Sequence, residues 1–309
     1  MDPNLLYWKS QGQSFFSRLK IWFDLLDPLS LLSSENEIQN ARAAIENAEK
    51  FDKKDDHAVA LSLTSVHADS GAVLPKVFRP PAVLPLSALL VAGSCLPHRT
   101  VKPALFWQLL MHTYYAGFNY ANRNRSSEKC KTTTLKHALL ISGTVSYAAV
   151  AGVLPQVIIS RLDKRSVALQ NFFRFVVPVP LLASLAAFSV LIVRSEESDS
   201  GIQVFDSSGN PVCISKAAGR QAVIDTACSR AALMGTSAAV PNLLVFLLRR
   251  RNSQLVSALS PISFTLVFGL MIPVSFSIFS QLGTIKKENL EEELQAAASD
   301  GHLFYHRGL

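Results

Sequence analysis

Residues 175–193 read FVVPVPLLASLAAFSVLIV, a stretch without a single Asp, Glu, Lys or Arg. A membrane-spanning helix needs about 20 apolar residues, and a charge at the bilayer centre costs at least ~2.5–3.5 kcal/mol. The stretch therefore predicts a transmembrane helix. Further uncharged runs cover residues 80–98, 103–122, 137–160, 231–248 and 252–285.

The composition of the whole chain agrees with this interpretation. Of its 309 residues, 17% are charged and 49% are hydrophobic, whereas a soluble domain carries about 25% charged residues. The net charge of +7 suits a lipid bilayer with anionic headgroups. Nucleic-acid binding would need a basic face with interleaved aromatic residues on a soluble domain, and the sequence shows none, so we expect no nucleic-acid partner.

We predict an all-α, multi-pass membrane protein, a helical bundle with about five, or as many as six, transmembrane helices. The run 80–98 is the weakest because four prolines interrupt it, and a partial or re-entrant helix is expected there. The run 252–285 exceeds one span, and we expect a tilted helix from about Ser263 behind an interfacial lead-in broken at Pro261. The transmembrane domain, 80–285, then lies between a polar N-terminal region, 1–79, and a charged tail, 286–309.

The segments outside the spans carry amphipathic patterns. Residues 14–27 place aromatic and basic side chains on opposite helical faces, so this helix either lies in the membrane interface or packs on the protein's own spans. A second amphipathic helix follows the capping residue Ser34. In the loop 194–230, alternation and turn residues predict a small β-hairpin and then a helix over 217–230. The tail from Ile285 reads as charged and helical.

A row of polar residues runs along the second uncharged stretch. Spacings of four, three, four and three place its members on one helical face: Gln108, His112, Tyr115, Asn119 and Asn122. Polar groups in hydrocarbon need partners or water, so this face is expected to point into the bundle. It is either a path or binding wall for a small polar solute, or a set of interhelical hydrogen bonds worth ~0.6 kcal/mol each.

Prolines inside several uncharged runs form a second candidate feature. Each removes a backbone donor, and transporters use helices broken in this way to coordinate solutes at mid-membrane. The candidates are Pro241 with Asn242, and Pro273. The alternative is a simple kink whose free carbonyl finds another partner.

The sequence lacks the common motifs of catalytic sites and metal sites. The sequence has no HExxH, no GxxxxGK[ST] and no GxSxG motif, and its four cysteines form no CxxC pair. We therefore expect neither an enzyme nor a metal site or cofactor, and we assign no catalytic residue.

Several ordered motifs resemble one known family. Residues 67–71 (HADSG) resemble the HPDTG signature of the sideroflexins, with His67, Asp69 and Gly71 retained. Residues 103–108 (PALFWQ) resemble its PAxxFWQ element, and 119–123 (NYANR), which ends at Arg123, resembles NYxNR. The resemblance extends over about residues 15–309. Residues 273–279 and the ending at 304–308 are most similar to the divergent fourth paralogue of the family.

This resemblance implies a multi-pass protein of the mitochondrial inner membrane that transports amino acids, with links to one-carbon metabolism and iron homeostasis. The divergent paralogue is associated instead with assembly of respiratory complex I. Transporting members carry an Asn-Cys pair in the fourth run, whereas residues 183–188 here read ASLAAF, which argues against serine as the solute. Two functions are thus expected: a carrier for a small amino acid or related metabolite, or a membrane scaffold that docks complex I assembly intermediates.

Overall fold

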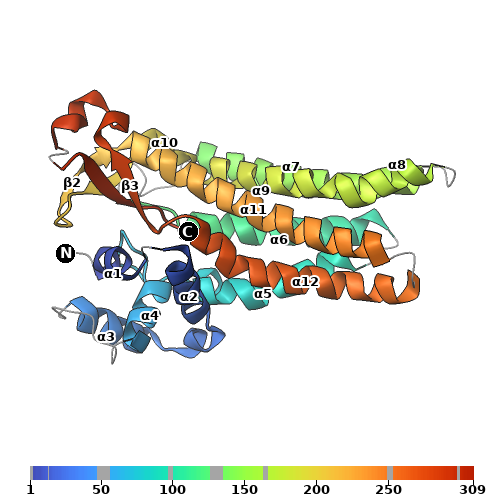
Figure 1. The fold of residues 1–309 in the computed structure, drawn as a ribbon, viewed down its shortest axis with the longest axis horizontal. Helices are drawn as coiled ribbons and strands as arrows, with labels where there is room; N and C mark the ends of the chain where they lie inside the picture. The colour runs from blue at the N-terminus through green and yellow to red at the C-terminus, as the bar shows by residue number, and fades with distance from the viewer. Residues whose placement is uncertain are drawn as a thin grey trace.

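Long helices run side by side along most of the molecule, and a group of short helices and a small sheet lie together at one end (Figure 1). The computed structural model describes residues 3–12, 14–46, 56–96, 100–125, 135–162, 166–248, 253–297 and 300–309. We call the end that holds the short helices and the sheet the head.

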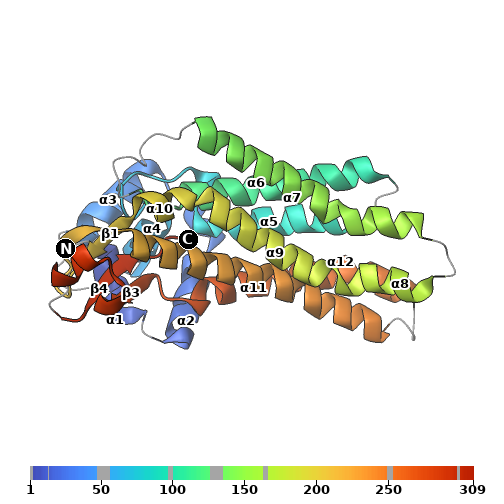
Figure 2. The same cartoon turned by 90° about the horizontal axis from the view of Figure 1, so that it is seen from above.

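The bundle closes on itself as a ring of helices. In order around the ring, α7 packs on α6, α6 on α5, α5 on α12, α12 on α11, α11 on α9, and α9 again on α7 (Figure 2). Their bounds are α5 Pro80–Cys95, α6 Val101–Ala121, α7 Leu135–Arg161, α9 Pro178–Val193, α11 Lys216–Leu248 and α12 Ser253–Ile278. Helix α8, Val167–Asn171, leads through a π-helical turn at Phe172–Val176 into α9.

This is a helical membrane protein, as predicted. Among the described residues, four stretches are long and apolar enough to cross a bilayer: Leu135–Arg161, Val167–Val193, Lys216–Leu248 and Pro261–Ile278. Helix α5 is shorter, and α6 carries the polar row, yet both lie alongside these helices in the ring. A total of five or six crossings thus stays a prediction that depends on α5 and α6.

The side chains of the bundle are arranged for lipid outside and polar contacts inside. Leu139, Leu247 and Leu270 are each more than 60% exposed on the outer surface. By contrast, Ser87 and Ser237 are completely buried between helices. Hydrocarbon solvates apolar side chains and leaves hydroxyls without partners, so this distribution is the one that a bilayer favours.

Two sequence predictions about helix boundaries are wrong. Helix α12 begins at Ser253 and continues through Pro261, so no separate lead-in precedes a start near Ser263. Likewise, the helix predicted over 217–230 and the run 231–248 are one continuous helix, α11. A proline in a helix costs one backbone hydrogen bond, and a helix packed among neighbours can continue through it.

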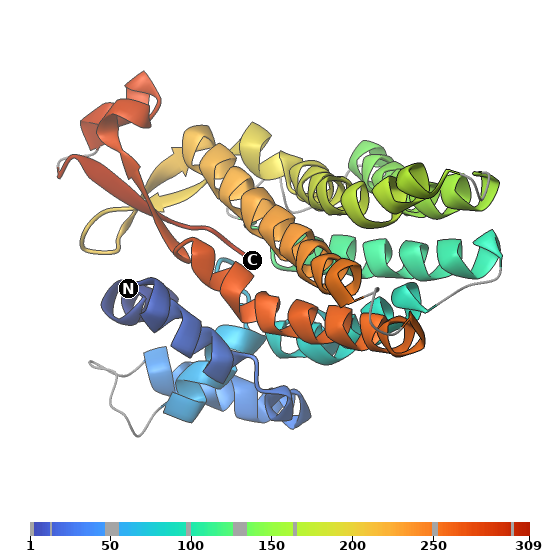
Figure 3. The ribbon, with the colours of Figure 1, turned by 45° about the vertical axis from the view of Figure 1, so that its right-hand side comes forward.

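The described part of the N-terminal region forms helices that lie at the head (Figure 3). They are α1 Pro3–Gln11, α2 Phe15–Leu25, α3 Glu35–Glu46 and α4 Asp56–Ser65. Ser34 and Glu37 cap the start of α3 reciprocally, with each backbone N–H donating to the other residue's side chain, as the capping pattern predicts.

Helix α2 packs on the protein's own spans, which is one of the two alternatives left open by its amphipathic pattern, and its position in the membrane interface stays a prediction. It runs across the end of the bundle in both perpendicular views (Figures 1 and 2). Trp22 is buried, with its ring centroid 4.8 Å from that of Phe276 on α12. Phe16 and Phe23 are 79% and 54% exposed on the other side of the helix. One face of α2 therefore packs on a span, and its aromatic residues on the other face point away from the protein.

The sheet has four antiparallel strands in the order β2-β1-β4-β3. Strands β1, Ile202–Phe205, and β2, Pro211–Ser215, are the predicted hairpin, which is confirmed. Strands β3, Leu282–Lys286, and β4, His302–His306, come from the tail, so the prediction of a helical tail is wrong. The remaining short elements are α10 Ser195–Ser200 and 3-10 turns at Pro28–Leu32, Lys76–Phe78, Lys287–Asn289 and Glu292–Ala297.

Candidate functional site

A closed internal cavity lies where α6, α9 and α11 meet. Helix α6 contributes His112, Tyr115 and Asn119 to its lining, which are three of the five members of the polar row. Helix α6 also contributes Met111, and the other walls are made by Leu182, Ala186 and Ser189 of α9 and by Arg230 and Met234 of α11. Its volume of about 20 Å³ is room for roughly one water molecule. The cavity as it stands is therefore smaller than an amino acid.

Polar atoms in the cavity lining lack partners. Among the described residues, nothing forms a hydrogen bond with Nε2 of His112 or with Oδ1 of Asn119. The Tyr115 hydroxyl donates to Oγ of Ser87 at 2.6 Å, and the Asn119 amide nitrogen donates to the Tyr115 carbonyl at 2.8 Å. A buried polar atom without a partner costs about 1–3 kcal/mol, so two such atoms beside one cavity indicate a place for a polar solute.

Arg230 is a lining residue that the sequence analysis missed. Its side chain is buried, and its guanidinium carbon lies 4.5 Å from the Phe276 ring centroid and 5.9 Å from that of Phe118. Nη1 donates to Oγ of Ser275 at 3.4 Å. In the sequence, Arg230 stands at the border of an uncharged run and reads as the end of a helix. Because α11 continues through it, the arginine lies inside the bundle instead.

The other predicted solute-path residues lie away from this cavity. Gln108 points at α7, where a Cβ at Gly152 would come 2.9 Å from its Oε1. Pro241 is buried within α11, and Asn242 donates to the Phe175 carbonyl at 3.3 Å. Pro273 lies within α12, where its carbonyl accepts from the Ser277 hydroxyl at 2.7 Å. The helices remain helical at these prolines, and no unwound segment presents free carbonyls to the cavity within the described residues.

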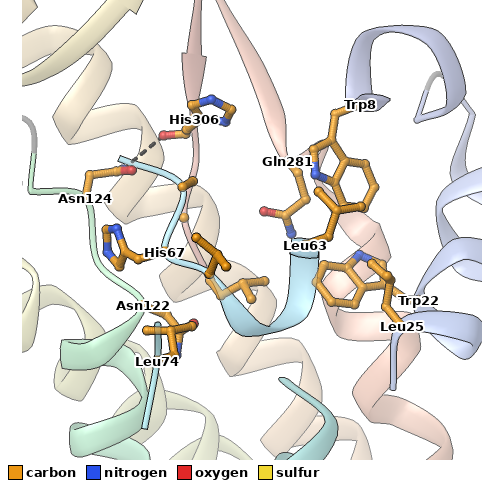
Figure 4. A pocket seen from close by; sticks show the side chains of 14 residues that line it. Trp8, Trp22, Leu25, Leu63, His67, Leu74, Asn122, Asn124, Gln281 and His306 are labelled. Carbon is orange, nitrogen blue, oxygen red and sulfur yellow. Dashed lines mark hydrogen bonds between the residues drawn. The ribbon is translucent and has the colours of Figure 1, made fainter. Parts of the chain in front are cut away.

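Asn122, the last residue of the polar row, lines a second pocket at the head (Figure 4). This pocket has a volume of about 80 Å³ and also contains His67, Asn124, Gln281 and His306, with Trp8 and Trp22 on its far side. The Asn122 amide donates to the carbonyls of Phe78 and Phe118, both at 2.9 Å. Since Asn119 and Asn122 are one helical turn apart, the polar row connects the inner cavity with the head pocket.

The segment at 67–71 is a turn that joins the head to the end of α6. The backbone N–H groups of Asp69 and Ser70 both donate to Nδ1 of His67 at 3.3 Å, so the ring proton is assigned to Nε2, which donates to the Arg123 carbonyl at 2.7 Å. Burial lowers the pKa of His67, partly opposed by the charge of Asp69. Gly71 completes the turn with a φ of +66°, in the left-handed region that glycine favours. These contacts give the segment a role in joining elements.

Arg123 lies at the same joint and is paired. Its Nη2 is 3.1 Å from Oε2 of Glu196, and its guanidinium carbon is 3.7 Å from the Tyr120 ring centroid. Asp69 accepts a hydrogen bond at 2.9 Å from the backbone of Arg125, close to this pair. The four signature residues therefore assemble at the head end of α6, outside the inner cavity.

Comparisons with known proteins agree on one family. A family profile described as Sideroflexins matches residues 4–309. Sideroflexin-4 of Danio rerio is 52% identical over 317 residues, which cover 100% of both chains. Sideroflexin-4 of Homo sapiens is 34% identical over 100% of this chain and 93% of its own, and Sideroflexin-5 of Homo sapiens is 27% identical over 97% and 91%. No solved structure matches the chain.

Proposed function

Because this chain belongs to the sideroflexin family, we propose that it is a carrier of the mitochondrial inner membrane that moves a small amino acid or related metabolite other than serine. The observation that supports this proposal most is the polar cavity between α6, α9 and α11, with unpaired atoms of His112 and Asn119 facing it. Enclosed polar sites between helices near the middle of a bundle are typical of solute carriers. The proposal involves no chemical conversion and no cofactor.

The lining of α9 supports a solute without a side-chain hydroxyl. Leu182 and Ala186 present apolar surface to the cavity, and Ser189 is the polar residue that this helix contributes. Of these three residues, Ala186 lies within residues 183–188, the part of the fourth run where the family resemblance implies an amide. A site that hydrogen-bonds a hydroxyl rejects solutes without one, and an apolar wall has no such preference. Serine therefore gains nothing over a smaller solute at this wall.

Uptake by proteoliposomes tests the carrier function. We expect the purified protein to move at least one member of a panel of amino acids and related organic acids faster than empty liposomes. Replacing Asn119 and Asn122 together by alanine should abolish this uptake, because both amides belong to the polar row that connects the two pockets. Asn289→Ala, an exposed amide at the head, is the matched control and should leave uptake unchanged. Absence of uptake across the whole panel would refute the carrier function.

A membrane scaffold for respiratory complex I assembly intermediates is the second candidate. The observation that favours it is a patch of exposed apolar side chains on the N-terminal region, namely Phe16, Phe23, Leu29 and Leu32, which are between 54% and 80% exposed. Such a patch suits a membrane surface or a protein partner. In cells lacking the protein, assembled complex I should fall, and the Asn119→Ala/Asn122→Ala variant should restore it. Restoration by transport-competent variants alone would argue against a scaffold.

A further inference from the structure

The inner cavity contains a buried positive charge, and that charge defines a class of solute. Resting on the carrier function proposed above, we propose that the cavity binds a small monocarboxylate, a 2-hydroxy or 2-oxo acid with a short apolar side chain, whose carboxylate pairs with the guanidinium of Arg230. The proposal narrows the solute class from amino acids and related metabolites to anions without an ammonium group.

The buried arginines differ in whether a carboxylate balances their charge. Arg123 is paired with Glu196 and Arg194 with Glu197. Arg230 is equally buried, but no carboxylate of the described residues forms an ion pair with it. A buried charge without a partner is costly, and the chain balances Arg123 and Arg194 with acids from one short segment. Two further buried arginines, Arg79 and Arg307, form no ion pair with a described residue either, but they donate to the carbonyls of Leu74 and Phe276 and do not line the cavity, so Arg230 is the unbalanced charge at this site. An incoming anion would complete the pairing that the protein leaves open at Arg230.

The guanidinium of Arg230 stacks on an aromatic ring. Its carbon lies over the Phe276 ring at 4.5 Å, a cation–π contact that uses the flat face of the group. Within the described part of the chain, its hydrogen bond is the long one to Ser275, at 3.4 Å. Stacked arginines keep the N–H donors along their edge available, and these donors match the two oxygens of a carboxylate. The stacking thus holds Arg230 in place while leaving it able to bind an anion.

The cavity lining contains no acidic side chain. Its nine lining residues include no Asp or Glu, so an ammonium group would find no countercharge and would lie close to the positive charge of Arg230. A 2-hydroxyl group, in contrast, can donate to the unpaired Oδ1 of Asn119. Once the helices move apart enough to admit it, the short apolar body of the acid would lie against Leu182, Ala186 and Met234. The same lining therefore favours an α-hydroxy or α-oxo acid over the amino acid of the same shape.

Three ligands of nearly equal size separate these charge classes: L-lactate, L-alanine and L-alaninamide. Binding is measured as thermal stabilisation of the purified full-length protein in detergent, and flux as uptake by proteoliposomes. An ammonium group beside the guanidinium of Arg230 places two positive charges together, which costs several kcal/mol. Lactate should therefore bind at least about 10-fold more tightly than alanine, and alaninamide, which has no carboxylate, should not bind. Alanine binding as tightly as lactate, or no lactate binding at all, would overturn the inference.

Variants identify the residue responsible. Arg230→Gln should weaken lactate binding at least about 10-fold. Arg230→Lys should retain part of the lactate binding, because lysine keeps the positive charge but lacks the paired N–H donors of the guanidinium. Arg220→Gln removes an exposed positive charge from the same helix and should bind lactate like the wild type. Undiminished lactate binding by folded Arg230→Gln would also overturn the inference. If that variant does not fold, the order in which the wild-type protein binds lactate, alanine and alaninamide still tests the inference.

The two proposals fail in different ways. If lactate binds through Arg230 but no solute crosses the liposome membrane, the monocarboxylate site stands and the carrier function is refuted. If alanine or another amino acid is transported and lactate neither binds nor crosses, the carrier function stands and the monocarboxylate inference is refuted.

Discussion

Nη2 of Arg194 lies 2.7 Å from Oε2 of Glu197 at the end of α9, and neither side chain is exposed to solvent. The same arginine donates to the Thr226 hydroxyl at 2.8 Å and to the Arg307 carbonyl at 2.6 Å. Glu197 in turn accepts from the Asn124 amide at 2.8 Å. This ion pair therefore joins α9, α11, the C-terminal segment and the segment after α6 where the bundle meets the head.

Glu197→Gln should strongly destabilise the protein. The substitution leaves the guanidinium of Arg194 buried without its countercharge, and breaking a buried pair in this way costs about 3–5 kcal/mol. The measurement is the midpoint of thermal or denaturant unfolding in detergent. Glu292→Gln, which removes an exposed carboxylate at the head, is the matched control and should leave the midpoint unchanged. Equal midpoints for both variants would show that the pair does not hold the head to the bundle.

Gly219→Ala should disrupt the contact between α11 and α10. A Cβ at this position would lie 2.0 Å from the backbone oxygen of Glu197, and a backbone atom cannot rotate away as a side chain can. We expect a loss of about 3 kcal/mol or more, seen as a low yield of monodisperse protein and a lowered unfolding midpoint.

Gly235→Ala provides the control on the same helix. Its Cβ would lie 3.4 Å from the Cβ of Ala183, an ordinary contact, so this variant should keep the yield of the wild type. If Gly219→Ala were as stable as Gly235→Ala, α11 and α10 would not approach as closely as described here.

Leu303→Ala should show how much the C-terminal strand contributes to the head. Leu303 is 1% exposed and lies on β4, which pairs with β1 on one side and β3 on the other. Truncation of such a residue costs about 2–5 kcal/mol. Val212→Ala on the edge strand β2 removes an exposed side chain and should change stability by less than about 0.5 kcal/mol. Similar unfolding midpoints for the two variants would contradict a packed sheet.

The sequence predicts the features of this molecule that depend on neighbouring residues. Uncharged runs predict the helices of the bundle, and a regular spacing brings His112, Tyr115 and Asn119 onto one face. Strands β3 and β4 were not predicted, because they contain five residues each and lie on either side of the acidic residues 291–293, which suggested a helix. Strand pairing with β1 is a long-range contact, and a local pattern does not contain it.

Arg230 was missed for a related reason. A single charge beside an apolar run ordinarily marks the point where a helix leaves the membrane. The helix that follows the hairpin is continuous with the span, so this arginine enters the bundle, where the rings of Phe118 and Phe276 accommodate it. The contacts of Arg230 come from helices far apart in the sequence, and these helices are brought together only by the packing of the whole bundle.

The buried imidazole of His67 should make the joint between head and bundle sensitive to acid. Burial lowers the pKa of His67 below its usual value of 6.5. Between the lowered pKa and about 6.5, the unfolded chain binds a proton at this residue and the folded chain does not. Stability therefore rises with pH in this window and is lost as the pH falls through it, by at most about 1.4 kcal/mol per pH unit. Protonation of Nδ1 would also remove the acceptor of the hydrogen bonds from the backbone N–H groups of Asp69 and Ser70.

The unfolding midpoint, measured in detergent between pH 7.5 and pH 5.5, tests this effect. The decrease on acidification should be smaller in His67→Gln than in the wild type, since the variant has no titrating group at the joint, even though its midpoint at pH 7.5 is lower. His57→Gln replaces an exposed histidine on α4 and should keep the full decrease of the wild type. If His67→Gln lost as much stability as the wild type, the acid sensitivity would arise elsewhere, and the neutral ring would not be what fastens the turn to the carbonyl of Arg123.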